Sequence, residues 1–259
     1  MVLRSLLALL RFFTSIPVGK GVGIEDAARG FYLIPLIGLI EGAIVGGALY
    51  FAKVVELPAL IASCVAMALH AVVTGGLHLD GFIDYSEAVA SHRRGAEALR
   101  VMKDPRKGAF ALIAMTLFAL TWFSALCILY RALQPLELLG TIVIAYVASS
   151  ECMYVAAYFS APEPYQGLGK LFVELSKSKR KAVASIAIAS AVCTVIASAL
   201  RIQLTGIVIA VASGLATAFT VVDSRRRLGY ANGDVLGFCY ELSRIVSLLS
   251  ASVVAWFMH

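Results

Sequence analysis

Three carboxylates, Asp80, Asp84 and Glu87, lie within eight residues of one another. Their i, i+4, i+7 spacing would place all three on one face of a helix. Like charges this close repel each other unless a cation lies between them. Mg²⁺ meets that need, because it binds through one or two carboxylates while substrate phosphates fill other positions. The spacing therefore predicts a magnesium site, against the alternative of a solvated polar helix cap.

A second polar cluster surrounds Asp104, about twenty residues further along the chain. Lys103, Arg106 and Lys107 flank this carboxylate immediately before an apolar run. Such cations are common anchors at a membrane surface, and they are also the side chains that a pyrophosphate needs. The cluster thus predicts a fourth acidic ligand within a phosphate-binding segment.

The third polar cluster contains Asp234, in a turn that begins at Asn232. A carboxylate at this position either holds metal or caps the helix that follows. Arg226 and Arg227 precede the turn in an arginine run, and Gly167 belongs to a G-x-G sequence that permits close backbone approach to a ligand. An acidic metal site ringed by cations is typical of phosphoryl-group transfer, in which the protein supplies positioning and charge neutralisation.

The elements that must position these residues are membrane helices. Of the 259 residues, 60% are apolar and 15% are charged, and the mean hydropathy is +0.87. A spanning helix needs about 20 mostly apolar residues. We predict an all-α polytopic membrane protein with six or seven spans, a short N-terminal amphipathic or re-entrant helix, and one domain over residues 1–259. The predicted spans are 31–55, 57–79, 109–131, 136–159, 182–201, 203–222 and 236–258.

The distribution of the +6 net charge predicts the orientation. Loops 80–108, 160–181 and 223–235 hold nearly all basic residues beyond the N-terminal four, whereas Lys53, Arg131 and Arg201 fall on the other side. Because cytoplasmic loops carry an excess of Lys and Arg, the pattern indicates a cell-membrane protein with its N-terminus and charged site inside and its C-terminus outside. It favours the bilayer, and not nucleic acid, as the partner of these charges.

Two further sequence patterns predict residues that pack in the protein interior. Gly38, Gly42 and Gly46 put three small residues on one helix face, which permits close approach of another helix. The five cysteines lie in apolar stretches without a C-x-x-C pair, so they are expected to be core residues and not metal ligands or disulfides.

Ionisable groups within the predicted spans need partners, because unpaired charge in a bilayer is costly. Glu241 and Arg244 lie three residues apart on one helix face and are expected to neutralise each other. For His70 and Glu151 the sequence leaves two alternatives: each side chain makes an interior hydrogen bond, or it lines a polar cavity.

Several motifs together carry a family resemblance. They are Leu10–Val18, Phe31–Gly38, Gly75–Gly81 with Asp84, Met102–Asp104 with Arg106 and Gly108–Ala109, and Gly233–Asp234. Over about residues 7–250, the chain closely resembles cobalamin synthase, the adenosylcobinamide-GDP ribazoletransferase family. It departs from the family pattern at Glu87, where Asp is expected, and at Tyr230 and Asn232, which replace a Gly and a Thr.

The resemblance implies a Mg²⁺-dependent transferase for the last assembly step of cobalamin. The phosphocobinamide group of adenosylcobinamide-GDP would pass to the 5′-hydroxyl of α-ribazole, or α-ribazole 5′-phosphate would be the acceptor, with release of GMP. Association with other enzymes of this assembly, and a homo-oligomer, are compatible with it.

The resemblance also assigns roles to residues. The implied metal ligands are Asp80, Asp84, Glu87, Asp104 and Asp234. The implied catalytic set is His78, Asp80, Asp84 and Asp104, with His78 as the candidate base or as a hydrogen-bond partner of a ligating carboxylate. The implied substrate-binding residues are Lys103, Arg106, Lys107, Gly167, Arg226 and Arg227.

Two other functions compete. A CDP-alcohol phosphotransferase carries D-x-x-D-G-x-x-A-R, whereas this chain has Asp-Gly-x-x-Asp without the Ala-Arg. An ion-coupled transporter would use Glu41, His70 and Glu151 as coupling sites within the membrane. Against transport, the densest acidic cluster lies at the predicted membrane surface and not at the midplane.

Overall fold

The computed structural model describes residues 2–18 and 21–258, and this part of the chain is helical, with one isolated β-bridge between Pro162 and Ala231. In chain order the helices are α1 Val2–Phe13, α2 Ile24–Arg29, the 3₁₀ helix η1 Phe31–Leu33, α3 Ile34–Val54, α4 Ala59–Val73, α5 Leu77–Ala90, α6 Gly95–Lys103, α7 Ala109–Ala132, α8 Pro135–Phe159, α9 Leu168–Leu175, α10 Lys179–Ala199, α11 Gln203–Arg227 and α12 Gly233–Met258.

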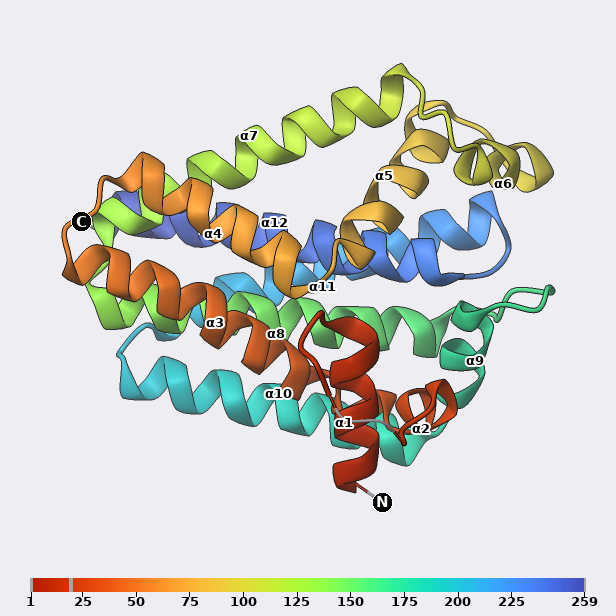
Figure 1. The fold of residues 1–259 in the computed structure, drawn as a ribbon, viewed down its shortest axis with the longest axis horizontal. Helices are drawn as coiled ribbons and strands as arrows, with labels where there is room; N and C mark the ends of the chain where they lie inside the picture. The colour runs from red at the N-terminus through yellow and green to blue at the C-terminus, as the bar shows by residue number, and fades with distance from the viewer. Residues whose placement is uncertain (1, 19–20, 259) are drawn as a thin grey trace.

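Six of these helical segments are long and apolar enough to cross a membrane: η1 with α3, then α7, α8, α10, α11 and α12. The bent pair α4 and α5 would make a seventh span. The long helices lie side by side, with α5, α6 and α9 at one end of the bundle and the C-terminus at the other (Figure 1). The prediction of an all-α polytopic membrane protein with six or seven spans is confirmed.

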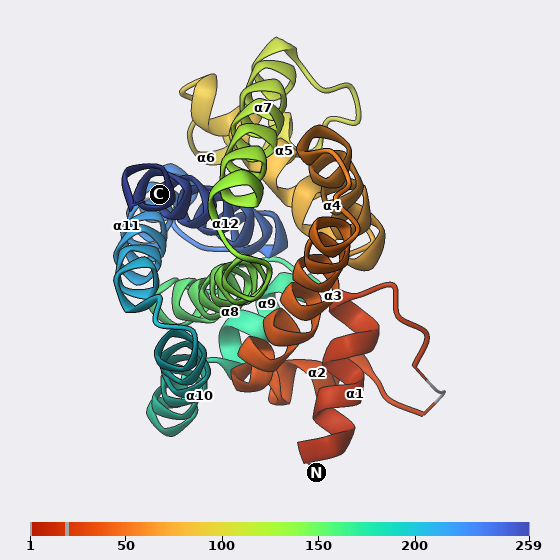
Figure 2. The ribbon, with the colours of Figure 1, turned by 90° about the vertical axis from the view of Figure 1, so that its left-hand side faces the viewer.

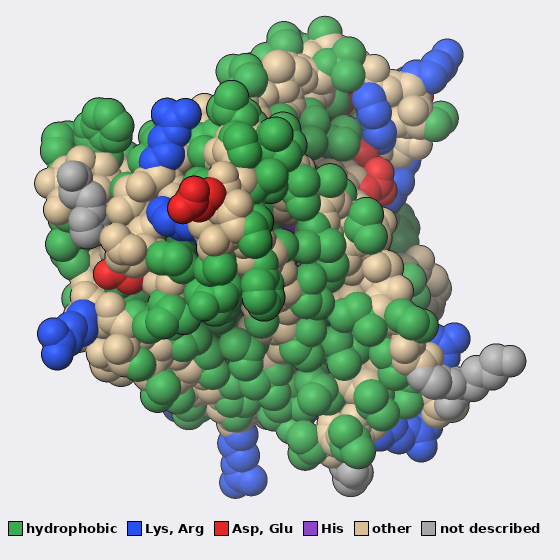
Figure 3. Space-filling model, turned by 60° about the vertical axis from the view of Figure 1, so that its left-hand side comes forward, with side chains coloured by type: hydrophobic (Ala, Val, Ile, Leu, Met, Phe, Trp, Pro, Cys, Tyr) green, Lys and Arg blue, Asp and Glu red, His purple; other side chains and the backbone are tan. Residues whose placement is uncertain are grey.

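Helices α8 and α12 form the middle of the bundle, and they are the most buried of the spans with α3 next. Figure 2 shows α3, α4, α7, α10 and α11 arranged around them. Hydrophobic side chains cover most of the face drawn in Figure 3. An apolar exterior of this kind suits contact with lipid tails. The spanning segments are helices, which satisfy their backbone hydrogen bonds internally, as the bilayer requires.

Close packing of α3 on α8 depends on the predicted glycine stripe. A methyl group on Gly42 would lie 2.9 Å from the Cα atom of Val143, and one on Gly46 would lie 3.0 Å from the Leu139 side chain. These spacings leave little or no room for a side chain. The interpretation of the stripe as a packing surface is therefore confirmed.

The second predicted span, 57–79, is wrong in its C-terminal boundary. Helix α4 ends at Val73, and after a break α5 leaves at an angle of 94° to it. Gly75 and Gly76 make this bend with φ values of +60° and +71°, a left-handed conformation that glycine adopts without steric cost. As a result the segment predicted as a loop, 80–108, is largely the two helices α5 and α6.

The predicted N-terminal amphipathic helix is α1, which runs across the direction of the spans (Figure 1). Its apolar side buries Leu9 and Phe13, while the Nε atom of Arg4 lies 3.0 Å from a carboxylate oxygen of Asp26 on α2. This helix brings the sequence around Phe13 to the same end of the bundle as α5 and α9.

Most of the buried ionisable groups have protein partners. The Nε2 atom of His70 lies 2.9 Å from Oε1 of Glu241, and the guanidinium of Arg244 donates to Oε2 of the same carboxylate. The predicted pairing of Glu241 with Arg244 is confirmed, and His70 makes an interior hydrogen bond.

The other two intramembrane carboxylates accept hydrogen bonds as well. Glu41 accepts one from the hydroxyl of Tyr240 at 2.5 Å, and Glu151 accepts one from Ser185 at 2.5 Å. The polar interior of the bundle is thus mainly a set of paired side chains.

All five cysteines are free, but the prediction that they are core residues is wrong for Cys64, which is exposed. Cys152 and Cys239 are buried, and Cys127 and Cys193 are partly buried.

Candidate active site

Helices α5 and α12 cross at two glycines. A methyl group on Gly81 would lie 2.9 Å from the carbonyl oxygen of Asp234, and one on Gly237 would lie 3.2 Å from the carbonyl oxygen of His78. Only residues without a side chain permit backbones to approach this closely. The crossing brings the acidic segment of α5 next to Asp234, although about 150 residues separate the two in the sequence.

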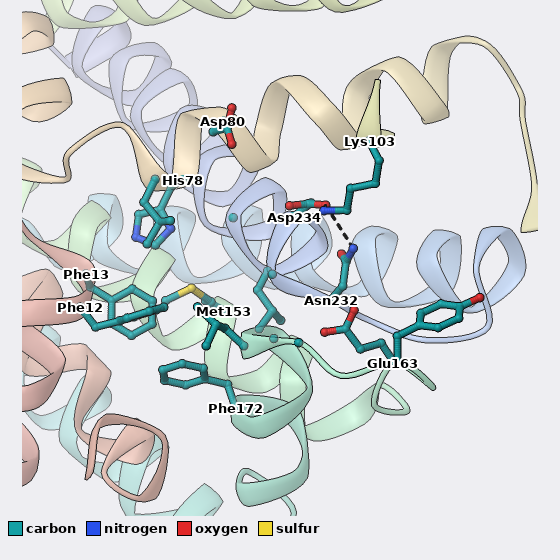
Figure 4. Close-up of a pocket in the computed structure, with 18 of the residues that line it drawn as sticks. Phe12, Phe13, His78, Asp80, Lys103, Met153, Glu163, Phe172, Asn232 and Asp234 are labelled. Atoms are coloured by element: carbon teal, nitrogen blue, oxygen red, sulfur yellow. Dashed lines mark hydrogen bonds and ion pairs between the residues drawn. The ribbon is translucent and has the colours of Figure 1, made fainter. Parts of the chain in front are cut away.

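A pocket of about 450 Å³ opens beside this crossing (Figure 4). Its walls come from the end of α1, from α5 and α6, from Met153 of α8, from the loop before α9, from α9 itself and from the start of α12. Among the residues predicted for the site, those that line the pocket are His78, Asp80, Lys103, Gly167 and Asp234.

Lys103 and Asp234 face each other across the polar part of the pocket. The Nζ atom of Lys103 lies 2.9 Å from Oδ2 of Asp234, and the Asn232 side-chain amide donates to the same oxygen at 3.1 Å. Asn232 also caps α12, because its Oδ1 atom accepts a hydrogen bond from the backbone amide of Val235 at 3.0 Å. Asp234 is therefore held in place from two sides.

The ammonium group of Lys103 lies among carboxylates. Partial burial lowers its pKa, but Asp234, Asp84 and Glu163 outweigh that effect, so the pKa of Lys103 lies above its ordinary value. The side chain is 59% exposed at the pocket, which leaves it accessible to a ligand. An accessible lysine that is charged at neutral pH is suited to a phosphate group.

Asp84 lies behind the pocket, where its side chain is 10% exposed. The Nζ atom of Lys107 is 2.6 Å from Oδ1 of Asp84, yet this oxygen has no hydrogen bond of acceptable geometry in the described part of the chain. The lysine therefore neutralises the carboxylate, and a cation bound at this oxygen would have to share it with Lys107.

Glu87 has a different environment from the other carboxylates of the acidic stripe. It is buried, and its Oε2 atom accepts a hydrogen bond from the backbone amide of Ala111 at 2.7 Å. This contact satisfies a free amide in the first turn of α7, where a negative charge is also favourable. Glu87 does not line the pocket.

Asp104 and Arg106 form a local turn beyond the end of α6. The backbone amide of Arg106 donates to Oδ1 of Asp104 at 2.9 Å, and its Nε atom lies 3.4 Å away. These hydrogen bonds hold the pKa of Asp104 below its ordinary value. The Arg106 side chain is 90% exposed, and neither residue lines the pocket.

Arg227 ties the end of α11 to the last turn of α5 and to the turn that follows it. It pairs with Asp223 at 2.8 Å and donates to the carbonyl oxygens of Ala88 and Arg93 at 2.9 and 2.6 Å. Arg226 is exposed, and neither arginine lines the pocket.

His78 lies where the polar part of the pocket meets an aromatic part. Its ring is almost fully buried and stacks on Tyr240, with the centroids 4.1 Å apart and the planes at 28°. The Tyr240 hydroxyl is in turn held by Glu41. This support fixes the imidazole at the wall of the pocket.

Sequence reasoning missed several side chains that line the pocket. They include Phe12, Phe13, Met153, Glu163, Phe172 and Asn232. For Phe12 and Phe13 the amphipathic pattern of the N-terminal helix was a usable signal. Met153 and Phe172 are ordinary apolar residues within helical runs, so no local pattern marks them.

Among the residues that the structure describes, no three carboxylate, imidazole or thiol groups converge as a ready set of metal ligands. The predicted acidic residues instead fall into three environments: beside the pocket (Asp80, Asp84 and Asp234), at the start of α7 (Glu87) and in an outer turn (Asp104). Of these residues, Asp80 and Asp234 are the two whose oxygens line the pocket.

The fold and the pocket define a multi-pass helical membrane protein with a charged pocket at one end of its bundle. The sequence model of the family described as "Cobalamin-5-phosphate synthase" matches residues 5–252. The chain therefore belongs to this family. No solved structure gave a significant match.

Several curated proteins named "Adenosylcobinamide-GDP ribazoletransferase" are similar over nearly their whole length. The protein from Halorubrum lacusprofundi is 33% identical over 99% of this chain and 99% of its own. That from Alkaliphilus oremlandii is 30% identical over 96% and 97%, and that from Citrobacter koseri is 28% identical over 94% and 97%.

Proposed function

We propose that this chain transfers the phosphocobinamide group of adenosylcobinamide-GDP to α-ribazole or its 5′-phosphate, with Mg²⁺, and releases GMP. As a member of the cobalamin synthase family, it is a transferase that acts on a phosphate-containing substrate in cobalamin synthesis. The observation that best supports the proposed reaction is the pocket where Lys103 faces Asp234, with Asp80 and His78 on its wall.

The two acceptors constrain the attacking group. α-Ribazole 5′-phosphate has no free 5′-hydroxyl, so a site that serves both acceptors needs a secondary ribose hydroxyl as the nucleophile. We assign the attack to that group in place of the 5′-hydroxyl. Its oxygen forms a bond to the phosphorus that carries the cobinamide arm, the bond from this phosphorus to the bridging oxygen breaks, and GMP leaves.

The residues at the pocket fit the roles that this reaction needs. Lys103 neutralises the pyrophosphate, because it is charged and accessible. His78 accepts the proton of the attacking hydroxyl, since it is the imidazole on the pocket wall beside Asp80 (Figure 4). No covalent intermediate with the protein is required.

The oxygen donors beside the pocket fit Mg²⁺, a cation that binds hard oxygens and keeps positions for substrate phosphates. Asp80 lines the pocket, Asp84 has a buried oxygen without a hydrogen bond, and Asp234 lies across the helix crossing from both. When bound, the ion stabilises negative charge on the phosphate under attack.

We propose structural roles, and not substrate or metal binding, for three of the remaining predicted residues. Glu87 caps α7, Asp104 orders the turn at Arg106, and Arg227 ties α11 to the α5–α6 segment. Each contact explains why the residue is charged without a direct contact to substrate.

The proposed site faces the cytoplasm. The segments at the pocket end of the bundle carry the basic clusters, whereas the turns at the opposite end hold Lys53, Arg131 and Arg201 (Figure 1). This asymmetry is that of a protein whose N-terminus is inside and whose C-terminus is outside.

The test is a product analysis with the full chain in liposomes. Adenosylcobinamide-GDP and α-ribazole are supplied with Mg²⁺, and GMP and the corrinoid are separated and identified. Equal release of GMP and a corrinoid carrying the ribazole nucleotide is expected. If neither forms, while a CDP-alcohol with an alcohol acceptor yields CMP, the chain has the rival phosphotransferase activity.

A further inference from the structure

Two of the carboxylates proposed as metal ligands already have a lysine as counter-ion. The Nζ atom of Lys107 lies 2.6 Å from Oδ1 of Asp84, and that of Lys103 lies 2.9 Å from Oδ2 of Asp234. Figure 4 shows Lys103 and Asp234 close together at the wall of the pocket. Asp80, the third carboxylate at the crossing, is exposed and makes no ion pair within the described part of the chain. Two ammonium groups therefore neutralise carboxylates that a divalent cation would bind.

Both lysines come from one short segment. Lys103 is the last residue of α6, and Lys107 follows four residues later in the turn before α7. Apart from Asp84, Lys107 contacts its own turn, where its Nζ atom donates to the carbonyl oxygen of Met102 at 3.0 Å. Because the ammonium group of a lysine is carried on a flexible four-carbon stem, it can leave Asp84 without any movement of α5.

The pair of Lys107 and Asp84 is the one that a metal must disturb. Oδ1 of Asp84 is buried, the Asp84 side chain is 10% exposed, and that of Lys107 is 24% exposed. Mg²⁺ needs a near-octahedral set of oxygens at about 2.0–2.1 Å, and the ammonium group covers part of that space at Asp84. A divalent cation and an ammonium group on one carboxylate also repel each other, because water screens charges poorly at a buried site.

We infer that Lys107 competes with the divalent cation for Asp84, and that it leaves this carboxylate when the cation binds. The inference rests on the proposed function, since it takes the acidic crossing as a Mg²⁺ site. The competing lysine has a role in the metal-free chain, because a buried carboxylate without a counter-ion is strongly destabilising. With the pair formed, neither Lys107 nor Asp84 lines the pocket.

Lys103 is a weaker competitor than Lys107. Its side chain is 59% exposed, so water screens its attraction to Asp234 and its repulsion of a cation. Asp234 also accepts a hydrogen bond from the side-chain amide of Asn232 at 3.1 Å, so it does not depend on the lysine alone. Loss of the charge at Lys103 should therefore change metal affinity less than loss of the charge at Lys107.

The first test measures metal binding without turnover. The full chain in nanodiscs of zwitterionic lipid is titrated with Mn²⁺, and the free ion is followed by electron paramagnetic resonance in the absence of corrinoid and nucleoside. The variant is Lys107→Met, which keeps the length of the side chain and removes its charge. Lys170→Met is the matched control, because Lys170 is 25% exposed, pairs with Glu174 at 4.0 Å and does not line the pocket.

Lys107→Met should bind Mn²⁺ about tenfold or more tightly than the wild type does, because a positive charge next to the metal is removed. Lys103→Met should gain affinity by a smaller factor, and Lys170→Met should bind as the wild type does. Equal or weaker binding by Lys107→Met, or no binding by either chain, would overturn the inference. An equal gain in Lys170→Met would overturn it as well, since the effect would then be one of overall charge.

A second measurement uses the wild-type chain, so it decides the question even if Lys107→Met does not fold. Accessible lysines are methylated with formaldehyde and a borohydride reagent at constant pH, with and without Mg²⁺, and each lysine is read from its peptide by mass spectrometry. Mg²⁺ should raise the labelling of Lys107 severalfold and leave that of Lys170 unchanged. Unchanged or lower labelling of Lys107 would show that its ion pair persists beside the metal, which contradicts the inference.

The proposed function is measured separately, by release of GMP from adenosylcobinamide-GDP and α-ribazole. Mg²⁺-dependent release by the wild-type chain, with unchanged Mn²⁺ affinity in Lys107→Met, would refute the competition and leave the proposed function intact. No release by the wild-type chain, with or without Mg²⁺, would overturn the proposed function itself.

Discussion

The crossing of α5 and α12 makes Gly81→Ala an informative substitution. The added methyl group would lie 2.9 Å from the carbonyl oxygen of Asp234 and 3.1 Å from its Cα atom. Both are backbone atoms, so no side-chain rotation relieves the contact. Ordinary contact begins at 3.4 Å, so the helices must separate by about 0.5 Å. Asp80 and Asp84 move away from Asp234 with α5.

The effect on catalysis follows from this displacement. A misplacement of about 1 Å costs about 10²-fold in rate, so a shift of half that size should cost about tenfold in kcat. The stability change should be small, because overpacking costs about 1–3 kcal/mol and the replacement of a helical glycine by alanine returns about 1 kcal/mol. The assay is GMP release by the variant in liposomes at saturating substrate, together with its thermal midpoint.

Gly47→Ala in α3 is the matched control, because a methyl group there meets no atom within 4 Å. It gains the same helix propensity without a clash, so we expect unchanged kcat and a thermal midpoint equal to or above that of the wild type. Wild-type kcat in Gly81→Ala, with the fold intact, would refute the argument that the glycine crossing sets the distance between the acidic residues.

Other substitutions test single contacts. Asp234→Asn should lower GMP release by about 10²-fold, because it removes a charged oxygen donor that would hold the Mg²⁺ proposed to stabilise the transition state, whereas Cys127→Ala should match the wild type. Lys103→Ala should weaken binding of adenosylcobinamide-GDP about tenfold or more in a direct titration and leave α-ribazole binding unchanged; equal losses for both would contradict its phosphate role. Because the pKa of Lys103 is raised in the folded state, its ion pair stabilises the fold below the ordinary lysine pKa of 10.5 and is lost as the pH rises through the raised value. The thermal midpoints of wild type and Lys103→Gln should thus differ at neutral pH and converge at strongly alkaline pH; a constant difference would argue against the pair. Arg227→Ala should destabilise the fold by about 1.5–3 kcal/mol through its lost charged hydrogen bonds, and Arg226→Ala should leave the midpoint unchanged.

The membrane architecture could be predicted from the sequence, because hydropathy and length alone define a spanning helix. The exception was the second span. Its apolar run continues through Gly75 and Gly76. A hydropathy average cannot detect the bend there, because the bend depends on the left-handed φ values of these two residues. The sequence shows the paired glycines, but it does not show the direction in which the helix after them leaves.

The candidate site could be predicted only in part, because it is formed by residues that lie far apart in the sequence. Asp80 and Lys103 were found from local spacing and His78 from the family resemblance, and all three line the pocket. Glu87 shares the same helix and the same spacing, yet it faces the start of α7 and serves as a cap. Which carboxylate of a stripe meets the pocket depends on the neighbours of each helix face, and spacing within one helix does not contain that information.

The aromatic side chains of the pocket illustrate the same limit. The amphipathic pattern of α1 predicts that Phe12 and Phe13 face an apolar partner, but it does not say which one. That partner is Phe172 on α9, about 160 residues away in the sequence. Only the packed bundle places the three rings in one pocket.

The central claim is that the crossing of α5 and α12 forms a Mg²⁺-dependent site for phosphoryl-group transfer. The most direct measurement is the rate of GMP release from adenosylcobinamide-GDP and α-ribazole as Mg²⁺ is titrated, for the wild-type chain and for Asp80→Ala in liposomes. We expect a saturable dependence on Mg²⁺ in the wild type and loss of release in the variant. Release without divalent metal, or a wild-type titration curve in Asp80→Ala, would contradict the claim.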